Sequence, residues 1–333
     1  MAQGRAVSMS DVAAEAGVSL KTVSRVVNEP EKVRPETRER VEEAMDRMGF
    51  RANYAGRSLK TGRYQTVGLA MLHLSGGNMA VFDGIASEAA ERGYAVTLVK
   101  AREGEELTLS EAARRMLPLP VDGMIFNLNR MVEDFQAYRS PAGLPTVIIS
   151  PVEHPACTTV SDDQEGCTRM ATEHLLERGH RRVAYIGGPE WSMAAQARLA
   201  GWRGALEGRG LEVPEPFEGD WTADSGYEAG VRIAGDADCT AVMCANDCMA
   251  LGAMEALRET GRRVPEDVSI IGVDDSLEGT VPHVELTSVR FRHRELGARA
   301  FDEVLRGVEE PGRRERVLIP GDLVERGSVA DLR

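Results

Sequence analysis

From Gln65 onward, short apolar runs alternate with longer amphipathic stretches, and this alternation constrains the fold more than any other feature of the chain. Apolar strands separated by helices are typical of parallel sheets, whose crossover connections are right-handed. The predicted strands are 66–71, 95–99, 123–126, 146–150, 183–186, 241–244 and 269–273, with a strand-like segment at 322–325. The predicted helices are 80–92, 106–117, 165–178, 194–208, 225–234, 247–260 and 293–307. These are too many units for one compact sheet, so we expect two lobes.

The N-terminal segment follows a different pattern, with two short helices on either side of a glycine. We expect Ser10 to cap a first helix over 11–16, which Gly17 ends in a left-handed conformation. Ser19 then caps a second helix over 20–27. Two helices joined by a short glycine-containing turn indicate a helix-turn-helix unit.

A third helix over 34–48 completes a small unit with one shared apolar core. The residues with core spacing are Val12, Ala13, Ala16, Val18, Val23, Val26, Val41, Ala44, Met45 and Met48. The outer face of the second helix, near its start, is where helix-turn-helix units contact base edges. Here that face carries Leu20, Lys21, Ser24 and Arg25. The alternative is a packing unit whose exposed cations are only solvated surface.

The charge of the chain is divided unevenly. Residues 1–63 carry 12 Lys and Arg against 9 Asp and Glu, a net charge of +3, whereas the remainder carries 28 against 44, a net charge of −16. This asymmetry is typical of a nucleic-acid-binding end on an acidic sensing body. A short basic linker over 50–63 joins the two parts. A helix this short is marginal in isolation, so we expect it to order only against DNA or a partner chain, or else to remain a plain tether.

Several other classes of protein are disfavoured. The five cysteines, at positions 157, 167, 239, 244 and 248, have neither disulfide nor zinc spacing, which suits a reducing cytoplasm. No apolar run reaches membrane-spanning length and residues 1–10 lack a signal peptide's apolar stretch, so we expect a cytoplasmic protein without a membrane partner. The chain lacks a Walker loop, a nucleophile elbow and a complete dinucleotide-binding turn. We therefore expect neither an enzyme nor a cofactor.

The N-terminal motifs resemble the headpiece of the lactose-repressor family. They are Asp11-Val12-Ala13, Ala16-Gly17-Val18-Ser19, Thr22-Val23-Ser24-Arg25-Val26-Val27-Asn28 and Thr37-Arg38-Glu39-Arg40-Val41. The resemblance implies that the second helix enters the major groove of double-stranded operator DNA, and it adds Ser19, Thr22 and Asn28 to the expected DNA contacts.

The resemblance also implies a hinge helix that enters the minor groove. Its expected contacts are Asn53, Tyr54, Gly56 and Leu59, and Leu59 matches the family's leucine wedge. Gly56 stands where the family usually has Ala, and a glycine inside a helix costs up to about 1 kcal/mol. We therefore expect a hinge helix that is less stable than usual.

The core resembles the same family. The motifs are Ala197-Arg198-Leu199-Ala200-Gly201-Trp202, Gly219-Asp220-Trp221-Thr222, Ala245-Asn246-Asp247 and Gly272-Val273-Asp274-Asp275. They imply an α/β core of the two-lobed periplasmic-binding-protein-like type (type I), after an all-α headpiece. The expected parts are a headpiece over 1–52, a hinge over 53–64, a first lobe over 65–161 with 292–320, and a second lobe over 162–291 with 321–333.

Matching by position also implies an effector site between the lobes. Arg198, Asn246 and Asp274 match the family's ligands of sugar hydroxyls, Trp221 matches the aromatic residue under the sugar ring, and Asn127 matches a polar wall position. Neighbouring hydroxyls suit a guanidinium, a carboxylate and a carboxamide, and the C–H face of a sugar suits an indole. The alternative is an ion pair between Arg198 and Asp274 that joins the lobes.

Three positions depart from the family's galactoside-binding pattern. Ser150 stands in place of an acidic sugar ligand, His293 in place of a phenylalanine, and 76–79 in place of an apolar wall. A galactoside is therefore only the leading expectation for the effector.

The interpretation as a whole is a homodimeric repressor whose operator affinity is modulated by a small carbohydrate. No leucine heptad follows 322–325, so we expect a dimer that faces two half-sites rather than a tetramer. We expect the sugar to lower operator affinity, and co-repression is the alternative. The competing functions are a purine- or other metabolite-responsive regulator, a transport-type sugar-binding protein and a sugar-processing enzyme.

Overall fold

The computed structural model describes residues 7–50, 62–71, 76–100 and 107–333. The chain divides into two compact units, Met1–Tyr64 and Gln65–Arg333, and each is described by itself. The predicted hinge contacts lie outside the described residues: Asn53, Tyr54, Gly56 and Leu59.

The N-terminal unit is a helix-turn-helix unit with a third helix. Its elements are α1 (Met9–Ala16), α2 (Leu20–Asn28), the 3-10 helix η1 (Pro30–Lys32) and α3 (Pro35–Met48). Gly17 ends α1 at a φ of 64°, as predicted, and the Ser19 hydroxyl caps α2 by accepting the N–H of Thr22 at 3.1 Å. The predicted cap at Ser10 was wrong, because α1 begins two residues earlier in a capping box of Ser8 and Asp11.

A single apolar cluster holds the three helices together. Its buried members are Val12, Ala13, Ala16, Val23, Val26, Val41 and Ala44, and the partly buried Val18, Met45 and Met48 pack against it. This matches the predicted core, and it leaves the opposite face of α2 to solvent.

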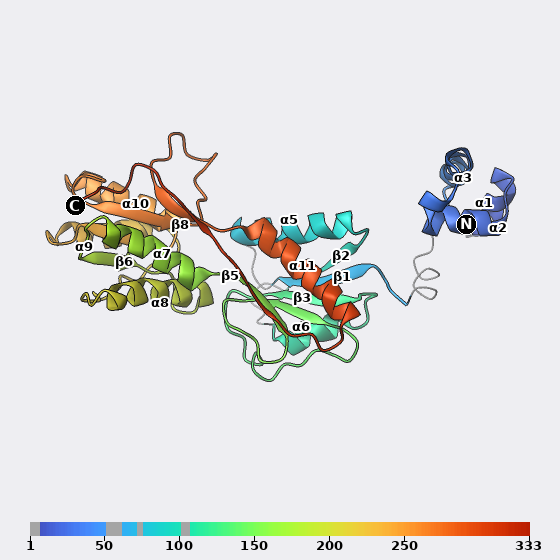
Figure 1. Ribbon diagram of the computed structural model, residues 1–333, viewed down its shortest axis with the longest axis horizontal. Helices are drawn as coiled ribbons and strands as arrows, with labels where there is room; N and C mark the ends of the chain where they lie inside the picture. Colours follow the sequence, from blue (N-terminus) through green and yellow to red (C-terminus); the bar gives the residue numbers. More distant parts are fainter. Residues whose placement is uncertain (1–6, 51–61, 72–75, 101–106) are drawn as a thin grey trace, which may run out of the picture. The chain divides into compact units, whose positions relative to one another are not determined.

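The second unit contains two sheets, which confirms the predicted two-lobed α/β core (Figure 1). The six-stranded sheet has the order β10-β5-β4-β3-β1-β2, and the five-stranded sheet has the order β11-β9-β8-β7-β6. Their strands are β1 (Thr66–Met71), β2 (Ala95–Lys100), β3 (Gly123–Asn127), β4 (Thr146–Ile149), β5 (Thr158–Asp162), β6 (Val183–Ile186), β7 (Ala241–Cys244), β8 (Ser269–Val273), β9 (Thr287–Arg290), β10 (Arg316–Ile319) and β11 (Asp322–Val324). The named strands pair in parallel, except that β11 runs antiparallel to β9.

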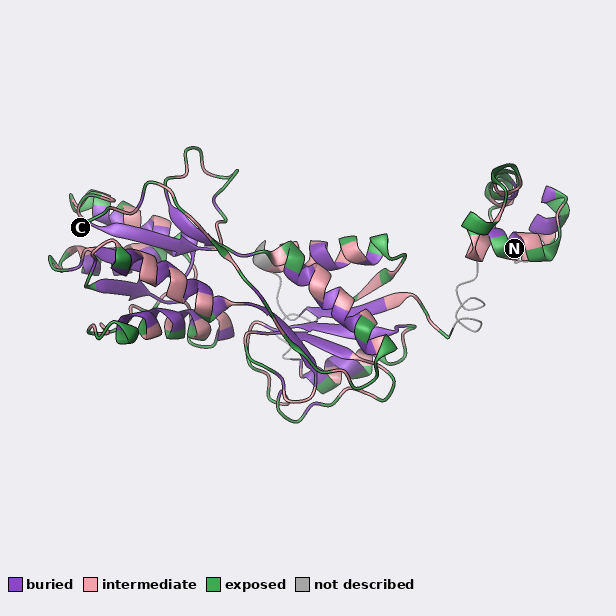
Figure 2. Cartoon of the chain, viewed as in Figure 1, coloured by how far each residue is buried: buried purple, intermediate pink, exposed green. Residues whose placement is uncertain are grey.

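Helices cover both sheets, and the inner strands of each sheet are almost entirely buried, whereas β2, β10 and β11 are partly exposed (Figure 2). The helices are α5 (Gly76–Glu91), α6 (Leu109–Met116), α7 (Gln164–Glu177), α8 (Met193–Gly208), α9 (Ala223–Ala234), α10 (Asp247–Glu259) and α11 (His293–Glu309). In the six-stranded sheet, alternate strand residues point to two separate apolar clusters, one against α5 and α11 and the other against α6. The five-stranded sheet has one continuous cluster with α7, α8, α9 and α10.

The chain passes between the sheets after β5, after β9 and after β10. The second passage leads directly into α11, which packs closely along α5. Gly84 and Gly297 allow this close approach, since a Cβ atom at either position would collide with a carbonyl oxygen of the other helix. The packing fixes the start of α11, and therefore His293, beside the passages.

Three strands were missed by the sequence prediction, namely β5, β9 and β10. Residues 158–162 are rich in Thr and Ser, yet all five are buried because β5 lies between β4 and β10. The hydroxyl groups of this strand are hydrogen-bonded; the Ser161 hydroxyl, for example, donates to the Asp162 carbonyl at 2.7 Å. Hydroxyl side chains of this kind hide a strand from a prediction based on apolar runs.

All five cysteines are free thiols. Four of the five free cysteines are buried and Cys248 is exposed. Among the described residues, no helix combines the length and apolar character needed to cross a membrane.

Candidate functional site

The predicted DNA contacts lie on α2 and at its cap. The exposed ones are Ser19, Leu20, Lys21 and Arg25, and the half-buried ones are Thr22, Ser24 and Asn28. The Asn28 amide donates to the Ser24 carbonyl at 2.7 Å, so part of its hydrogen-bonding capacity is used within the helix.

Two cations on this face are available to a ligand. Lys21 and Arg25 have no acidic partner within 4 Å among residues 7–50, whereas Lys32, Arg38 and Arg47 each pair with a glutamate. An unpaired cation pays no cost for breaking an existing ion pair when it contacts a phosphate or a base.

The predicted effector ligands gather at the carboxyl ends of parallel strands. Asn127 is the last residue of β3, Ser150 directly follows β4, and Asp274 directly follows β8. Asn246 lies two residues beyond β7, at the start of α10. The crevice outside the carboxyl ends of the strands is where open parallel sheets bind ligands.

Arg198, on α8, connects three segments of the second lobe. Its Nε donates to Gln164 Oε1 at 2.7 Å, one terminal nitrogen donates to the Ala245 carbonyl, and the other donates to Asp274 Oδ1 at 3.0 Å. The predicted alternative, an Arg198–Asp274 ion pair, is therefore present, but both residues belong to the five-stranded lobe and do not join the lobes. Each terminal nitrogen keeps a second N–H that a ligand can accept.

Asn246 holds Trp221 in place. The Asn246 carboxamide accepts the N–H of Met249 at 2.8 Å as the cap of α10, and it donates to the Trp221 carbonyl at 3.0 Å. The Trp221 indole packs over Gly188, where any Cβ atom would collide with the ring. The Arg198 guanidinium lies 5.6 Å from the centre of that ring, which brings the predicted stacking residue and the predicted hydroxyl ligand together.

The backbone is strained at the same place. Trp221, Asp274 and Asp275 have φ values of 75°, 96° and 49°, in the left-handed region that side chains other than glycine rarely adopt. Strain of this kind costs about 1–3 kcal/mol per residue and persists only where the surroundings impose it, often at ligand sites.

A buried carboxylate that the sequence analysis missed supports this turn. Asp247 Oδ2 accepts the N–H of Ser276 at 2.6 Å, and its Oδ1 accepts the Ser288 hydroxyl at 2.6 Å. Burial raises the pKa of Asp247 to about 6, although these hydrogen bonds oppose the shift. The signal in the sequence was its position, directly after Asn246 at the carboxyl end of β7.

The two predicted ligands of the first lobe have other contacts. Asn127 is buried and donates to Asn78 Oδ1 at 3.2 Å. Ser150 is 1% exposed; its hydroxyl accepts the N–H of Val152 at 3.1 Å and lies 3.8 Å from the sulfur of Met193. Ser150 therefore lines the junction of the lobes with little surface left for a ligand.

His293 lies beside a second carboxylate that was not predicted. The Nε2 of His293 is 3.4 Å from Oδ2 of Asp162, the last residue of β5. Burial lowers the pKa of His293, and burial raises the pKa of Asp162 to about 7, with Arg198 opposing the second shift and Asp274 adding to it. The charges of Arg198 and Asp274 act on the pKa values of both Asp162 and His293, so the two pairs lie close together.

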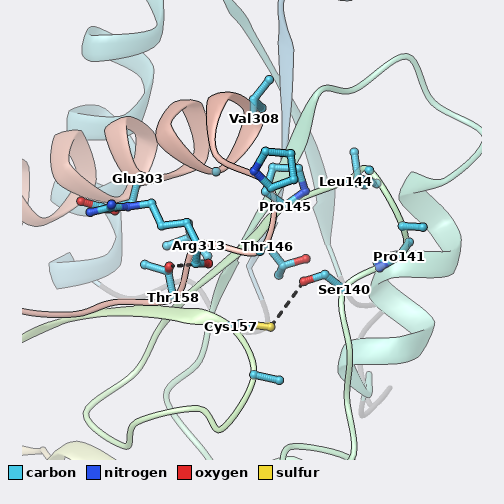
Figure 3. A pocket seen from close by; sticks show the side chains of 17 residues that line it. Ser140, Pro141, Leu144, Pro145, Thr146, Cys157, Thr158, Glu303, Val308 and Arg313 are labelled. Atoms are coloured by element: carbon cyan, nitrogen blue, oxygen red, sulfur yellow. Dashed lines mark hydrogen bonds and ion pairs between the residues drawn. The ribbon is translucent and has the colours of Figure 1, made fainter.

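Two cavities of the core are lined by residues other than the predicted effector ligands. One, of about 290 Å³, lies beside the start of α7, between Pro151 and Ala197, with Asp162 in its wall. The other, of about 260 Å³, lies near the amino ends of β4 and β5, where Figure 3 shows Glu303 and Arg313 on one side and Ser140 and Cys157 on the other. The second cavity therefore lies at the amino ends of the strands of the six-stranded sheet, whereas Asn127 lies at the carboxyl end of β3.

Each of the two units matches a known protein family. Residues 8–53 match the model of bacterial regulatory proteins of the lacI family, and residues 172–329 match the periplasmic binding protein-like domain. The lactose operon repressor of Escherichia coli (strain K12) is 31% identical over 96% of this chain and 90% of its own length. The HTH-type transcriptional regulator CelR of Thermobifida fusca is 35% identical over 94% of this chain and 96% of its own.

Solved structures agree with these relatives. The lac repressor dimer bound to operator and the anti-inducer ONPF superimposes with a TM-score of 0.81, at 29% identity, over 98% of this chain and 100% of the other. The complex of the regulator CelR with cellobiose gives a TM-score of 0.67, at 32% identity, over 97% and 99%.

The raised pKa of Asp162 predicts how replacing it changes stability with pH. An Asp carboxyl has an ordinary pKa of 3.8, and that of Asp162 is about 7, so the folded protein binds this proton more tightly than the unfolded chain. Ionisation of Asp162 therefore lowers the free energy of unfolding of the wild type as the pH rises from about 4 to about 7. In Asp162→Asn this loss is absent, so the advantage of the variant over the wild type should grow by up to about 3 kcal/mol between pH 5 and pH 8.

Thermal unfolding of both proteins from pH 5 to pH 8 measures this difference. Asp163→Asn is the matched control for the loss of one charge, since Asp163 caps α7 and Asn is an equally good cap. A difference in melting temperature between Asp162→Asn and the wild type that does not change with pH would show that Asp162 is not held in its neutral form.

Proposed function

This chain belongs to the lacI family of bacterial regulatory proteins, and we propose that it is a dimeric repressor whose operator affinity is lowered by a neutral sugar. The headpiece binds operator DNA through α2, and the sugar binds at the carboxyl ends of the strands of the core. A galactoside is the leading candidate, since the lactose operon repressor is among the relatives, and cellobiose is the ligand named for the regulator CelR.

The observation that carries the proposal is the grouping of Arg198, Trp221, Asn246 and Asp274. One side of this group is an indole, which suits the C–H face of a sugar ring. The other side offers the remaining N–H groups of Arg198 and the carboxylate of Asp274, whose side chain is 31% exposed. A guanidinium and a carboxylate side by side can donate to and accept from neighbouring hydroxyls.

The headpiece distinguishes this function from that of a transport-type sugar-binding protein. Lys21 and Arg25, which have no acidic partner within 4 Å among residues 7–50, stand on the exposed face of the second helix of a helix-turn-helix unit. In such units, that helix is the one that reads the major groove. A purine is the second candidate ligand, and a screen that includes both purines and sugars separates the two.

The first prediction concerns base recognition by α2. Changing Lys21 or Arg25 to Ala should cost about 1–3 kcal/mol on the specific site if the residue reads a base, and much less on unrelated DNA. The specific site is first selected from a random duplex library, and affinities are then measured by fluorescence anisotropy at fixed salt.

Arg47→Ala is the matched control, because Arg47 is already paired with Glu15 and Glu43. Equal losses on specific and unrelated duplexes would show that Lys21 and Arg25 contact phosphates only. Unchanged binding to both duplexes would contradict the assignment of α2 to the DNA surface.

The second prediction concerns Trp221. Trp221→Ala should weaken sugar binding at least about tenfold, which corresponds to about 1.4 kcal/mol, while operator affinity without sugar stays near that of the wild type. Trp221→Phe keeps an aromatic face and should retain most of the affinity. A thermal-shift screen of mono- and disaccharides identifies the sugar, because a ligand at 100 times its Kd stabilises the folded protein by about 2.7 kcal/mol.

Calorimetric titration of the wild type and both variants then measures the affinities. If Trp221→Ala bound the sugar with wild-type affinity, the Trp221 indole would not be part of the binding site. If a purine stabilised the protein and no sugar did, the effector would be the purine, the second candidate, and not a sugar.

A further inference from the structure

Asp162 is a buried carboxyl without a complete set of partners. Its side chain is 4% exposed, and its Oδ1 has no hydrogen-bond partner among the described residues. Its Oδ2 lies 3.4 Å from His293 Nε2, which is longer than the 2.7–3.2 Å of a good N–H···O bond. Leaving a buried polar group unsatisfied costs about 1–3 kcal/mol, so the arrangement calls for an explanation.

Two other buried carboxylates of the core, Glu303 and Asp247, are fully engaged. Glu303 is paired with Arg299, Arg306 and Arg313 at 3.0–3.2 Å. Asp247 accepts hydrogen bonds from the backbone and the hydroxyl groups around it. Asp83 and Asp275 also have an oxygen without a hydrogen bond, but each of them is ion-paired with an arginine. Among the described residues, Asp162 differs in having His293 as its one ion-pair partner.

Burial favours the neutral forms of both Asp162 and His293. Arg198 and Asp274 face Asp162 from the second lobe, His293 faces it from α11, and Cys167 faces it from α7. Burial raises the pKa of Asp162 and of Cys167 and lowers the pKa of His293. A neutral carboxyl and a neutral imidazole each contain one donor and at least one acceptor.

We propose that Asp162 and His293 together bind one hydroxyl group of the effector, in addition to the contacts of Arg198 and Asp274. This inference rests on the proposed sugar effector. His293 is the more accessible member, with 19% of its side chain exposed against 4% of that of Asp162. The pair thus extends the site from the second lobe to the start of α11.

The chemistry of the pair selects a hydroxyl over other groups. Because a hydroxyl both donates and accepts, it can satisfy a neutral carboxyl and a neutral imidazole at once. An ether or carbonyl oxygen can only accept, and a carboxylate would add a second negative charge beside Asp274. The pair therefore favours a neutral sugar with a free hydroxyl at this position.

A double-mutant cycle tests the proposal. The probes are lactose, cellobiose and galactose, and their affinities for the full chain are measured by calorimetry. His293→Phe and Asp162→Leu should each lower the affinity of the bound probe at least tenfold. The double variant should be no more than about twofold weaker than the weaker single variant, since both changes remove the same hydroxyl contact.

The pH dependence gives a second readout that does not need Asp162→Leu to fold. If only the neutral carboxyl binds, wild-type affinity falls about tenfold from pH 6 to pH 8, because the pKa of Asp162 is about 7. His293 stays neutral over most of this range, since its pKa lies below 6.5. Asp162→Asn, which is always neutral, should show no such fall, and Asp163→Asn should behave as the wild type does.

Three results overturn the proposal. Single variants that keep wild-type affinity, or losses that add in the double variant, would show that Asp162 and His293 do not share a ligand group. A wild-type affinity that is constant from pH 6 to pH 8 would exclude Asp162 as a titrating ligand. In all three cases Trp221→Ala would still lose the sugar, whereas the failure of all three sugars to bind the wild type would overturn the proposed function as well.

Discussion

The candidate site depends on one buried guanidinium. The Arg198 side chain is 7% exposed, and its three hydrogen bonds reach the start of α7, the turn after β7 and the turn after β8. A buried charge is tolerated only when it is paired and hydrogen-bonded, and removing one partner of such a pair typically costs about 3–5 kcal/mol. Arg198 therefore sets the positions of Asp274 and Trp221, and it orients its own free N–H groups without help from a ligand.

Much of the fold could be predicted from the sequence, because apolar strands and glycine-ended helices depend on local composition. The α1–Gly17–α2 turn and the strands such as β8 are examples. The failures have physical causes. β5 is built from Thr and Ser residues whose burial comes from neighbouring strands, and the cap of α1 moved to Ser8 because Asp11, three residues on, completes a capping box.

The candidate site was predictable only in part. The motifs identified Arg198, Trp221, Asn246 and Asp274, and the structure brings these four together at the ends of β7 and β8. The burial of Ser150 and the neighbours of His293 could not be predicted, because they depend on how β4, β5 and α11 meet at the junction of the lobes. Asp162 ends a strand that was itself missed, so no pattern marked it as a site residue.

The coupling between the two ligands is tested most directly by the operator affinity of the full chain with and without its sugar. The selected duplex is titrated with protein at constant salt, in the absence of sugar and at a saturating concentration of the one that binds best. Sugar should raise the Kd for the operator about 5- to 150-fold, a coupling of about 1–3 kcal/mol, and operator should weaken sugar binding by the same factor. A lower Kd in the presence of sugar, or a Kd unchanged by a sugar that calorimetry shows to be bound, would contradict this prediction.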